Sequence, residues 1–74
     1  MTSEEVRKHL RANPFQPFTV HLADGRSFDV LHSEFMAVSD GGRLAAITHK
    51  RTFEVVDLLL VTSIELKPPE SSAA

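Results

Sequence analysis

The sequence predicts a mainly β fold (α+β): a short N-terminal helix followed by a five-stranded, strongly bent antiparallel sheet or a small barrel. From Phe18 onward, apolar residues recur at every second position, which is the period of a half-buried strand. Short turn sequences rich in Asp and Gly separate these alternating runs. The alternative is a helix packed on one face of an open antiparallel sheet. Closure is favoured because it removes exposed strand edges.

The length and composition limit how such a fold can be stabilised. The chain has 74 residues, which predicts one small domain over residues 1–66. A domain of about 60 residues buries only about 60% of the surface of its unfolded chain. Disulfides, a bound metal or self-association commonly support domains of this size. The chain has no cysteine, which excludes disulfides and thiolate zinc sites and gives weight to self-association.

The helix is predicted over residues 2–12. Thr2 and Glu5 have the spacing of a capping box, in which each side chain accepts a backbone N–H of the first turn. Val6 and Leu10 lie one turn apart and form a narrow apolar stripe. A helix this short is marginal alone, so it must dock on the sheet. The connector PFQPF that follows is expected to tuck one or both phenylalanine rings under it.

The turn with the clearest sequence signal is Asp24-Gly25. A two-residue turn would pair Val20 with Asp29 and place a carboxylate on the apolar face. A three-residue loop over residues 23–25 instead pairs Val20 with Phe28, so that the apolar residues share one face. We therefore predict the longer loop, with the glycine in the left-handed conformation.

Further strand segments are predicted after the first hairpin, at residues 35–39, 43–48, 52–56 and 61–66. Asp57 is expected to cap a single helical turn over Leu58–Leu60, just before the closing strand. Residues 67–74, KPPESSAA, are expected to form a disordered tail.

The order of these parts resembles the Sm-like fold, and more broadly the SH3-like small barrels. FTVHLADGRSFDV resembles the first two strands of the Sm-like family and LLLVTSIEL its last strand. The basic-Gly pair that the family has before its final strand is absent, because Val56, Asp57 and Leu58 stand there. The Tyr-Lys-His stretch of the bacterial RNA-chaperone branch is also missing, so the resemblance carries RNA binding to no residue. The chain also resembles small bacterial proteins with the signature PFxPFxxxLADGRxF, which implies no activity.

No catalytic, cofactor or metal site is predicted, and we expect the protein not to be an enzyme. His32 and Glu34 offer two ligands, whereas a metal site normally needs three or four. The chain has neither a nucleophile elbow nor a glycine-rich phosphate loop. The glycines of Asp40–Gly42 are more typical of a turn between strands than of an anion-binding nest.

The net charge counts against a dedicated nucleic-acid binder without excluding a local basic patch, and hydropathy argues against a membrane or secretory segment. The formal net charge is −2, whereas a dedicated nucleic-acid binder is usually basic. The longest apolar run, Leu58–Val61, is too short to span a bilayer. The N-terminal segment MTSEEVRK lacks the apolar core of a secretory signal. We therefore predict a cytoplasmic protein without a membrane partner.

The later strands carry apolar residues on both of their alternating phases, which a small core cannot bury together. The inward set is expected to include Val30, Met36, Val38 and Val55. Residues of the other phase either lie under the helix or form an exposed interaction surface. We therefore predict a non-catalytic binding or assembly module that contacts another protein or itself. Its candidate interface residues are Leu31, Phe35, Val56 and Val61.

The alternative function is nucleic-acid binding by an Sm-like module. The loops carry four cations that could grip phosphates: Arg26, Arg43, Lys50 and Arg51. Phe53 could then offer a stacking face for a base. Against this, Phe53 is in phase with Val55 and is expected in the core, which leaves the cations as solvated turn residues.

Overall fold

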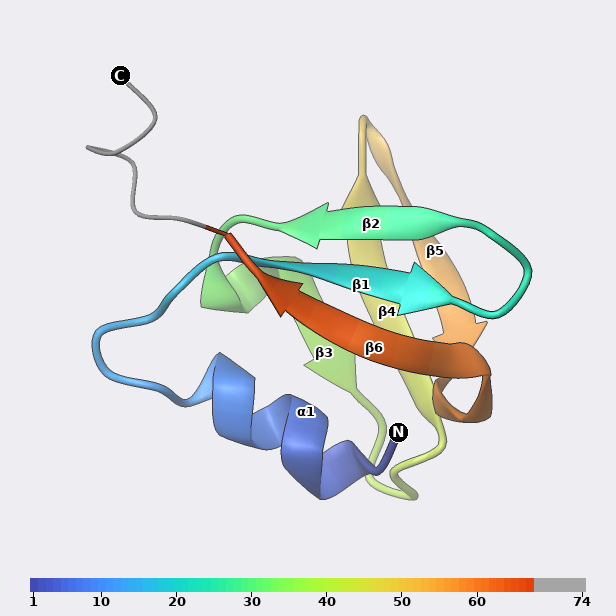
Figure 1. Cartoon of the computed structure of the whole chain (residues 1–74), viewed down its shortest axis with the longest axis horizontal. Coiled ribbons are helices and arrows are strands. Elements are labelled where there is room, and N and C mark those ends of the chain that lie inside the picture. Colours follow the sequence, from blue (N-terminus) through green and yellow to red (C-terminus); the bar gives the residue numbers. More distant parts are fainter. Residues whose placement is uncertain (68–74) are drawn as a thin grey trace.

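The computed structural model describes residues 1–67, which form one short helix and two three-stranded antiparallel sheets (Figure 1). The predicted tail, apart from Lys67, lies outside the described residues. The helix, α1, spans Ser3–Leu10. In spatial order, the first sheet contains β2 (Ser27–Val30), β1 (Phe18–Leu22) and β6 (Val61–Leu66). The second contains β3 (Met36–Val38), β4 (Leu44–His49) and β5 (Thr52–Asp57).

The predicted capping box begins α1. The Thr2 hydroxyl accepts a hydrogen bond from the backbone N–H of Glu5, and the Glu5 carboxylate accepts one from the backbone N–H of Thr2. The Thr2 hydroxyl also donates to the Glu5 carboxylate at 2.9 Å, and this hydrogen bond, followed by the one from the Thr2 backbone N–H, lowers the pKa of Glu5. Val6 is fully buried, and Phe18 packs tilted against the rings of His9 and Phe15. The connector therefore anchors the helix to the sheet as expected.

The first hairpin has the predicted register. Val20 pairs with Phe28, and the N–H of Leu22 donates to the carbonyl of Arg26 at 2.9 Å. Gly25 has φ +94°, in the left-handed region. Three loop residues with glycine at the third position allow both strands to keep their apolar residues on one face.

The single five-stranded sheet that the sequence predicts is not confirmed. Strand pairing divides six strands of the described residues between two sheets, which do not close on each other. The division falls between β2 and β3, where a 3₁₀ turn, η1 (Ser33–Phe35), interrupts the extended chain. The N–H of Phe35 donates to the carbonyl of His32 at 3.0 Å, so this segment bonds to itself rather than to a strand.

The turn between β5 and β6 agrees with its prediction. A second 3₁₀ turn, η2, spans Leu58–Leu60, and the Asp57 carboxylate accepts a hydrogen bond from the Leu59 N–H at 2.9 Å. This places Leu58 in the core and starts the closing strand at Val61.

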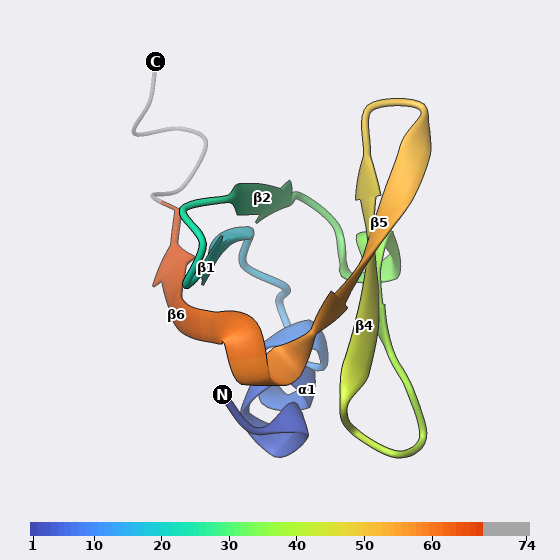
Figure 2. The same ribbon diagram turned by 90° about the vertical axis from the view of Figure 1, so that its right-hand side faces the viewer.

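The core lies between the two sheets and α1, as Figure 2 shows from the side. All twelve buried residues within 1–67 are apolar, and none is polar or charged. No helix in the described part of the chain is long and apolar enough to cross a membrane.

For β5 and β6, the prediction of which alternate residues point into the core is wrong. Val56 and Val61 are each only 3% exposed and belong to the core, whereas Val55 is 57% exposed. Val56 pairs with buried Ala45, because β4 and β5 are joined by a turn of two residues. Val61 turns inward because β6 has a bulge opposite His21 and Leu22, which shifts the strand's phase by one residue.

Candidate interaction surface

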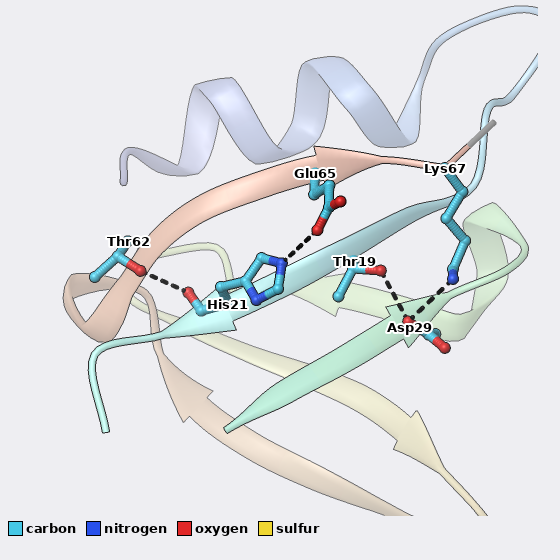
Figure 3. A network of polar contacts seen from close by, with 6 residues as sticks. All are labelled: Thr19, His21, Asp29, Thr62, Glu65 and Lys67. Carbon is cyan, nitrogen blue, oxygen red and sulfur yellow. Dashed lines mark hydrogen bonds and ion pairs between the residues drawn. The ribbon is translucent and has the colours of Figure 1, made fainter. Parts of the chain in front are cut away.

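The outward side of the first sheet is polar and internally paired (Figure 3). His21 Nε2 lies 2.9 Å from a Glu65 carboxylate oxygen. Asp29 accepts a hydrogen bond from the Thr19 hydroxyl at 2.8 Å and lies 3.4 Å from Lys67 Nζ. This is the alternation of an antiparallel sheet with one buried and one solvated side.

The outward side of the second sheet is mainly apolar. Strand pairing places Ala37 beside Ala46 and Ala46 beside Val55, while the neighbouring row holds Thr48 beside Phe53. Phe53 is 62% exposed. Leu44, also exposed, shares this side because alternate residues of a strand point the same way. We call this surface the outer face; it consists of Ala37, Leu44, Ala46, Phe53 and Val55.

A shallow groove runs across the outer face. It has a volume of about 220 Å³, and its lining includes the rings of Phe35 and Phe53 and the small side chains of Ala37 and Ala46. Glu34, Met36 and Thr48 complete the lining. Small residues beside two large rings leave a hollow that a partner's side chain can fill.

The first sheet and α1 lie on the side of β4 and β5 opposite to the outer face. In Figure 2 the first sheet and α1 lie to the left of these two strands. The inward side chains of β3, β4 and β5, namely Met36, Ala45, Ile47 and Val56, are buried there. Among the described residues, the outer face is therefore an uncovered side of a sheet, composed mainly of apolar side chains.

The four predicted interface residues do not form one surface. Val56 and Val61 are in the core, so neither is available to a partner. Leu31 is 48% exposed, and Phe35 is half-buried at the rim of the outer face. Sequence reasoning therefore found the rim of the outer face and missed its centre, Phe53 and Val55.

Leu31 and Phe35 also line a second groove, of about 560 Å³, between β2 and the end of β4. His49 packs edge-on against Phe28 there, at 5.2 Å between ring centroids. Lys50 lies at one end of the groove. Because its lining mixes charged and apolar groups, this groove is a less uniform surface than the outer face.

The four candidate phosphate-binding cations do not converge. Arg26 Nε lies 2.8 Å from Asp24, and Arg43 Nε lies 3.2 Å from Asp57. Lys50 and Arg51 follow β4, whereas Arg43 precedes it. A six-residue strand separates the two groups by about 20 Å. Two of the cations have carboxylate partners, and Phe53 lies on the outer face rather than in the core.

Asp57 lies at the end of β5, where its carboxylate contacts both the following turn and Arg43. Its pKa is lowered first by the hydrogen bond from the Leu59 N–H and also by the Arg43 guanidinium. A carboxyl with a lowered pKa in the folded state stabilises the fold above its unfolded pKa and loses this effect as pH falls through the folded value. We expect Asp57→Asn to reduce the loss of melting temperature between pH 7 and pH 3. Equal losses for wild-type and variant would contradict this role.

His32 and Glu34 gain no third potential metal ligand among the described residues. The His32 ring packs edge-on against Phe35, with 4.9 Å between ring centroids. Within residues 1–67, no group of three or more His, Asp or Glu side chains could hold a metal ion.

Comparisons with protein-family models, curated proteins and solved structures return no match to this chain.

Proposed function

We propose that this protein is a non-catalytic, cytoplasmic interaction or assembly module that binds a protein surface through its outer face. The proposal rests on one observation: the two sheets differ in the polarity of their outward sides. The first sheet presents paired polar groups to solvent, whereas the second presents Phe53 and Val55, both more than half exposed. An exposed patch of apolar side chains is typical of a protein-binding site.

The composition of the outer face suits a protein partner. Aromatic residues are enriched at the centres of protein interfaces, and they contribute most where they enter a well-packed pocket. Phe53 lines a groove together with Phe35 and the small side chains of Ala37 and Ala46. Complete burial of an exposed Phe or Val side chain contributes roughly 1.5–3 kcal/mol. Two such residues side by side therefore supply a large part of the free energy of a weak association.

We further propose that the fold is an open relative of the SH3-like and Sm-like barrels. In this interpretation β2, η1 and β3 together stand for one long bent strand, which the 3₁₀ turn interrupts. The 3₁₀ turn η2 before the closing strand, and the pairing of β1 with β6, support it. Function does not follow from this likeness, because small barrels serve many unrelated functions.

The test measures association against protein concentration. Wild-type protein is expected to gain mass between about 10 µM and 1 mM in light scattering, since one small apolar face gives weak affinity. The double variant Phe53→Thr/Val55→Thr is expected to stay monomeric and folded, because both side chains are exposed in the monomer. Threonine keeps the strand propensity of both positions.

The matched control is Leu59→Thr/Leu66→Thr. It removes two exposed apolar side chains that lie outside the outer face, one in η2 and one at the end of β6. This control should associate like wild-type. A loss of association in both double variants would show nonspecific adhesion and contradict the proposal. If wild-type is monomeric at 1 mM and the Phe53/Val55 variant retains every protein that wild-type retains in pull-downs, the outer face is not a binding site.

A further inference from the structure

The two sheets leave four strand edges without a strand partner, and three of them carry features that discourage pairing. β3 has only three residues, and β2 has four, with charged Asp29 among them. β6 is bulged and lies beside α1 (Figure 1), and the ammonium of Met1, which precedes the helix, donates to the Val61 carbonyl. Short length, bulges, charges and a covering helix are the usual protections of sheet edges.

β5 differs from these three edges. It has six residues, pairs with β4 without a bulge, and contains neither proline nor lysine. It also carries Phe53 and Val55, the two exposed apolar residues at the centre of the outer face. Its half-buried Glu54 is the charge most able to prevent pairing, and Arg26 Nη1 lies 3.8 Å from it. An edge of this kind readily pairs with another strand.

The register of β5 shows which backbone groups are free. The Leu58 N–H donates to the Arg43 carbonyl at 2.7 Å, and hydrogen-bonded pairs recur at every second residue from there. Thr52, Glu54 and Val56 therefore bond to β4. The N–H and C=O groups of Phe53 and Val55 point away from β4, toward the open edge.

We propose that this edge pairs with β5 of a second copy, antiparallel across a two-fold axis at Glu54. This inference rests on the proposed function and adds an assembly to it: pairing through the edge of β5 joins the outer faces of two copies and leaves the joined face open to a protein surface. In this register Phe53 exchanges backbone hydrogen bonds with the partner's Val55, and Val55 does so with the partner's Phe53. The two side chains become neighbours on the outer face, an aromatic and β-branched pair of the kind that stabilises sheets. The two outer faces then form one continuous surface.

Charge complementarity selects this register over its neighbours. It places Arg51 opposite the partner's Asp57, and by symmetry Asp57 opposite the partner's Arg51, in the same strand phase as Phe53 and Val55. A shift by two residues in one direction would set Phe53 against the partner's Asp57. The opposite shift would set Arg51 against the partner's Val55. On this side of the strand, the proposed register alone among these three joins opposite charges at both ends and apolar residues between them. On the other side it sets Glu54 opposite the partner's Glu54, and Arg26 Nη1, 3.8 Å from the carboxylate in each copy, offsets part of their repulsion.

Single cysteines test this register, because the chain has none of its own. Directly opposed residues at a non-hydrogen-bonded position have Cα atoms about 4.5 Å apart, which suits a disulfide. Glu54→Cys is therefore expected to form a covalent dimer under mild oxidation. Thr52→Cys is the matched control: it is on the same strand and side, but two such residues would lie about 13 Å apart across the axis.

The expected result is a mostly dimeric Glu54→Cys band and little dimer from Thr52→Cys on non-reducing gels. Equal crosslinking of the two variants, more from Thr52→Cys, or none from either would overturn the proposed pairing. If association still disappears in the Phe53/Val55 variant while Glu54→Cys fails to crosslink, the register is wrong and the proposed function stands. A monomeric wild-type at 1 mM overturns the pairing and leaves the proposed function to its pull-down test.

A charge reversal gives a second measurement that introduces no new bond. In the Arg51→Asp variant, a carboxylate at position 51 would face the partner's Asp57 at each end of the paired strands. We expect this variant to raise the dimer dissociation constant roughly tenfold at low salt. Lys50→Asp carries the same change of charge one residue away, off the outer face, and should have a smaller effect. An equal effect of both variants would contradict the proposed contact.

Discussion

Val56→Asp is expected to unfold this domain, whereas Val55→Asp leaves it folded. The two residues are neighbours on β5, but Val56 is buried against Ala45 and Val55 lies on the outer face. A carboxylate at position 56 would lose the burial of the valine and would enter a core that contains no polar partner. The cost exceeds about 4 kcal/mol, which is most of the stability of a domain of this size.

At position 55 the same substitution removes an exposed side chain, and we expect a cost below about 1 kcal/mol. Circular dichroism and urea unfolding at low micromolar concentration would measure both variants without interference from association. If Val55→Asp unfolds the chain and Val56→Asp does not, the strand phase described here, and the outer face with it, is wrong.

Gly42→Ala is expected to cost about 2–3 kcal/mol, because two effects act on one residue. Gly42 has φ +73°, a conformation that costs other residues roughly 1–2 kcal/mol. In addition, a Cβ atom there would lie 2.6 Å from the Ser3 hydroxyl oxygen and 3.0 Å from its Cβ. The turn between β3 and β4 therefore packs against the first residue of α1, and the Arg7 guanidinium adds a 2.7 Å hydrogen bond to the Ser39 carbonyl.

Alanine substitutions at two other glycines, measured by urea unfolding, distinguish the conformational cost from the cost of the close contact with Ser3. Gly41 has open space around it and no left-handed conformation, so Gly41→Ala should change the free energy of unfolding by less than about 0.5 kcal/mol. Gly25 has φ +94° but open space, so Gly25→Ala should show the conformational cost alone. A loss at Gly42 no larger than that at Gly25 would argue against close packing of α1 on the turn.

Local features were predictable wherever a residue type has one strong conformational preference. Thr2 and Glu5 cap α1 as their spacing indicates, and the Asp-Gly turn sets the register of the first hairpin. The Asp57 cap and the closing strand at residues 61–66 were also predictable. In each case a hydrogen bond or a φ angle within a few residues determines the outcome, so no distant contact is needed.

The interface could not be predicted in the same way, because both phases of β5 are apolar. Which phase turns inward depends on the turn before it, where Lys50 and Arg51 join His49 directly to Thr52. Lys50 adopts φ +58° there, although lysine does not signal such a turn. The register arithmetic used for the first hairpin, applied here to a two-residue turn at Lys50 and Arg51, would have placed Val55 beside Ala46 and revealed the outer face.

The sequence by itself determined the mainly β class, the capped helix, the first hairpin and the position of the final turn. Tertiary structure alone decided how the strands divide into two sheets and which apolar residues remain outside. The physical reason is that alternation reports a strand's period but not its orientation. Orientation follows from the pairing of distant segments and, at β6, from a bulge that no local signal marks. Phe53 and Val55 are exposed for that reason, and a partner's surface is what we propose covers them.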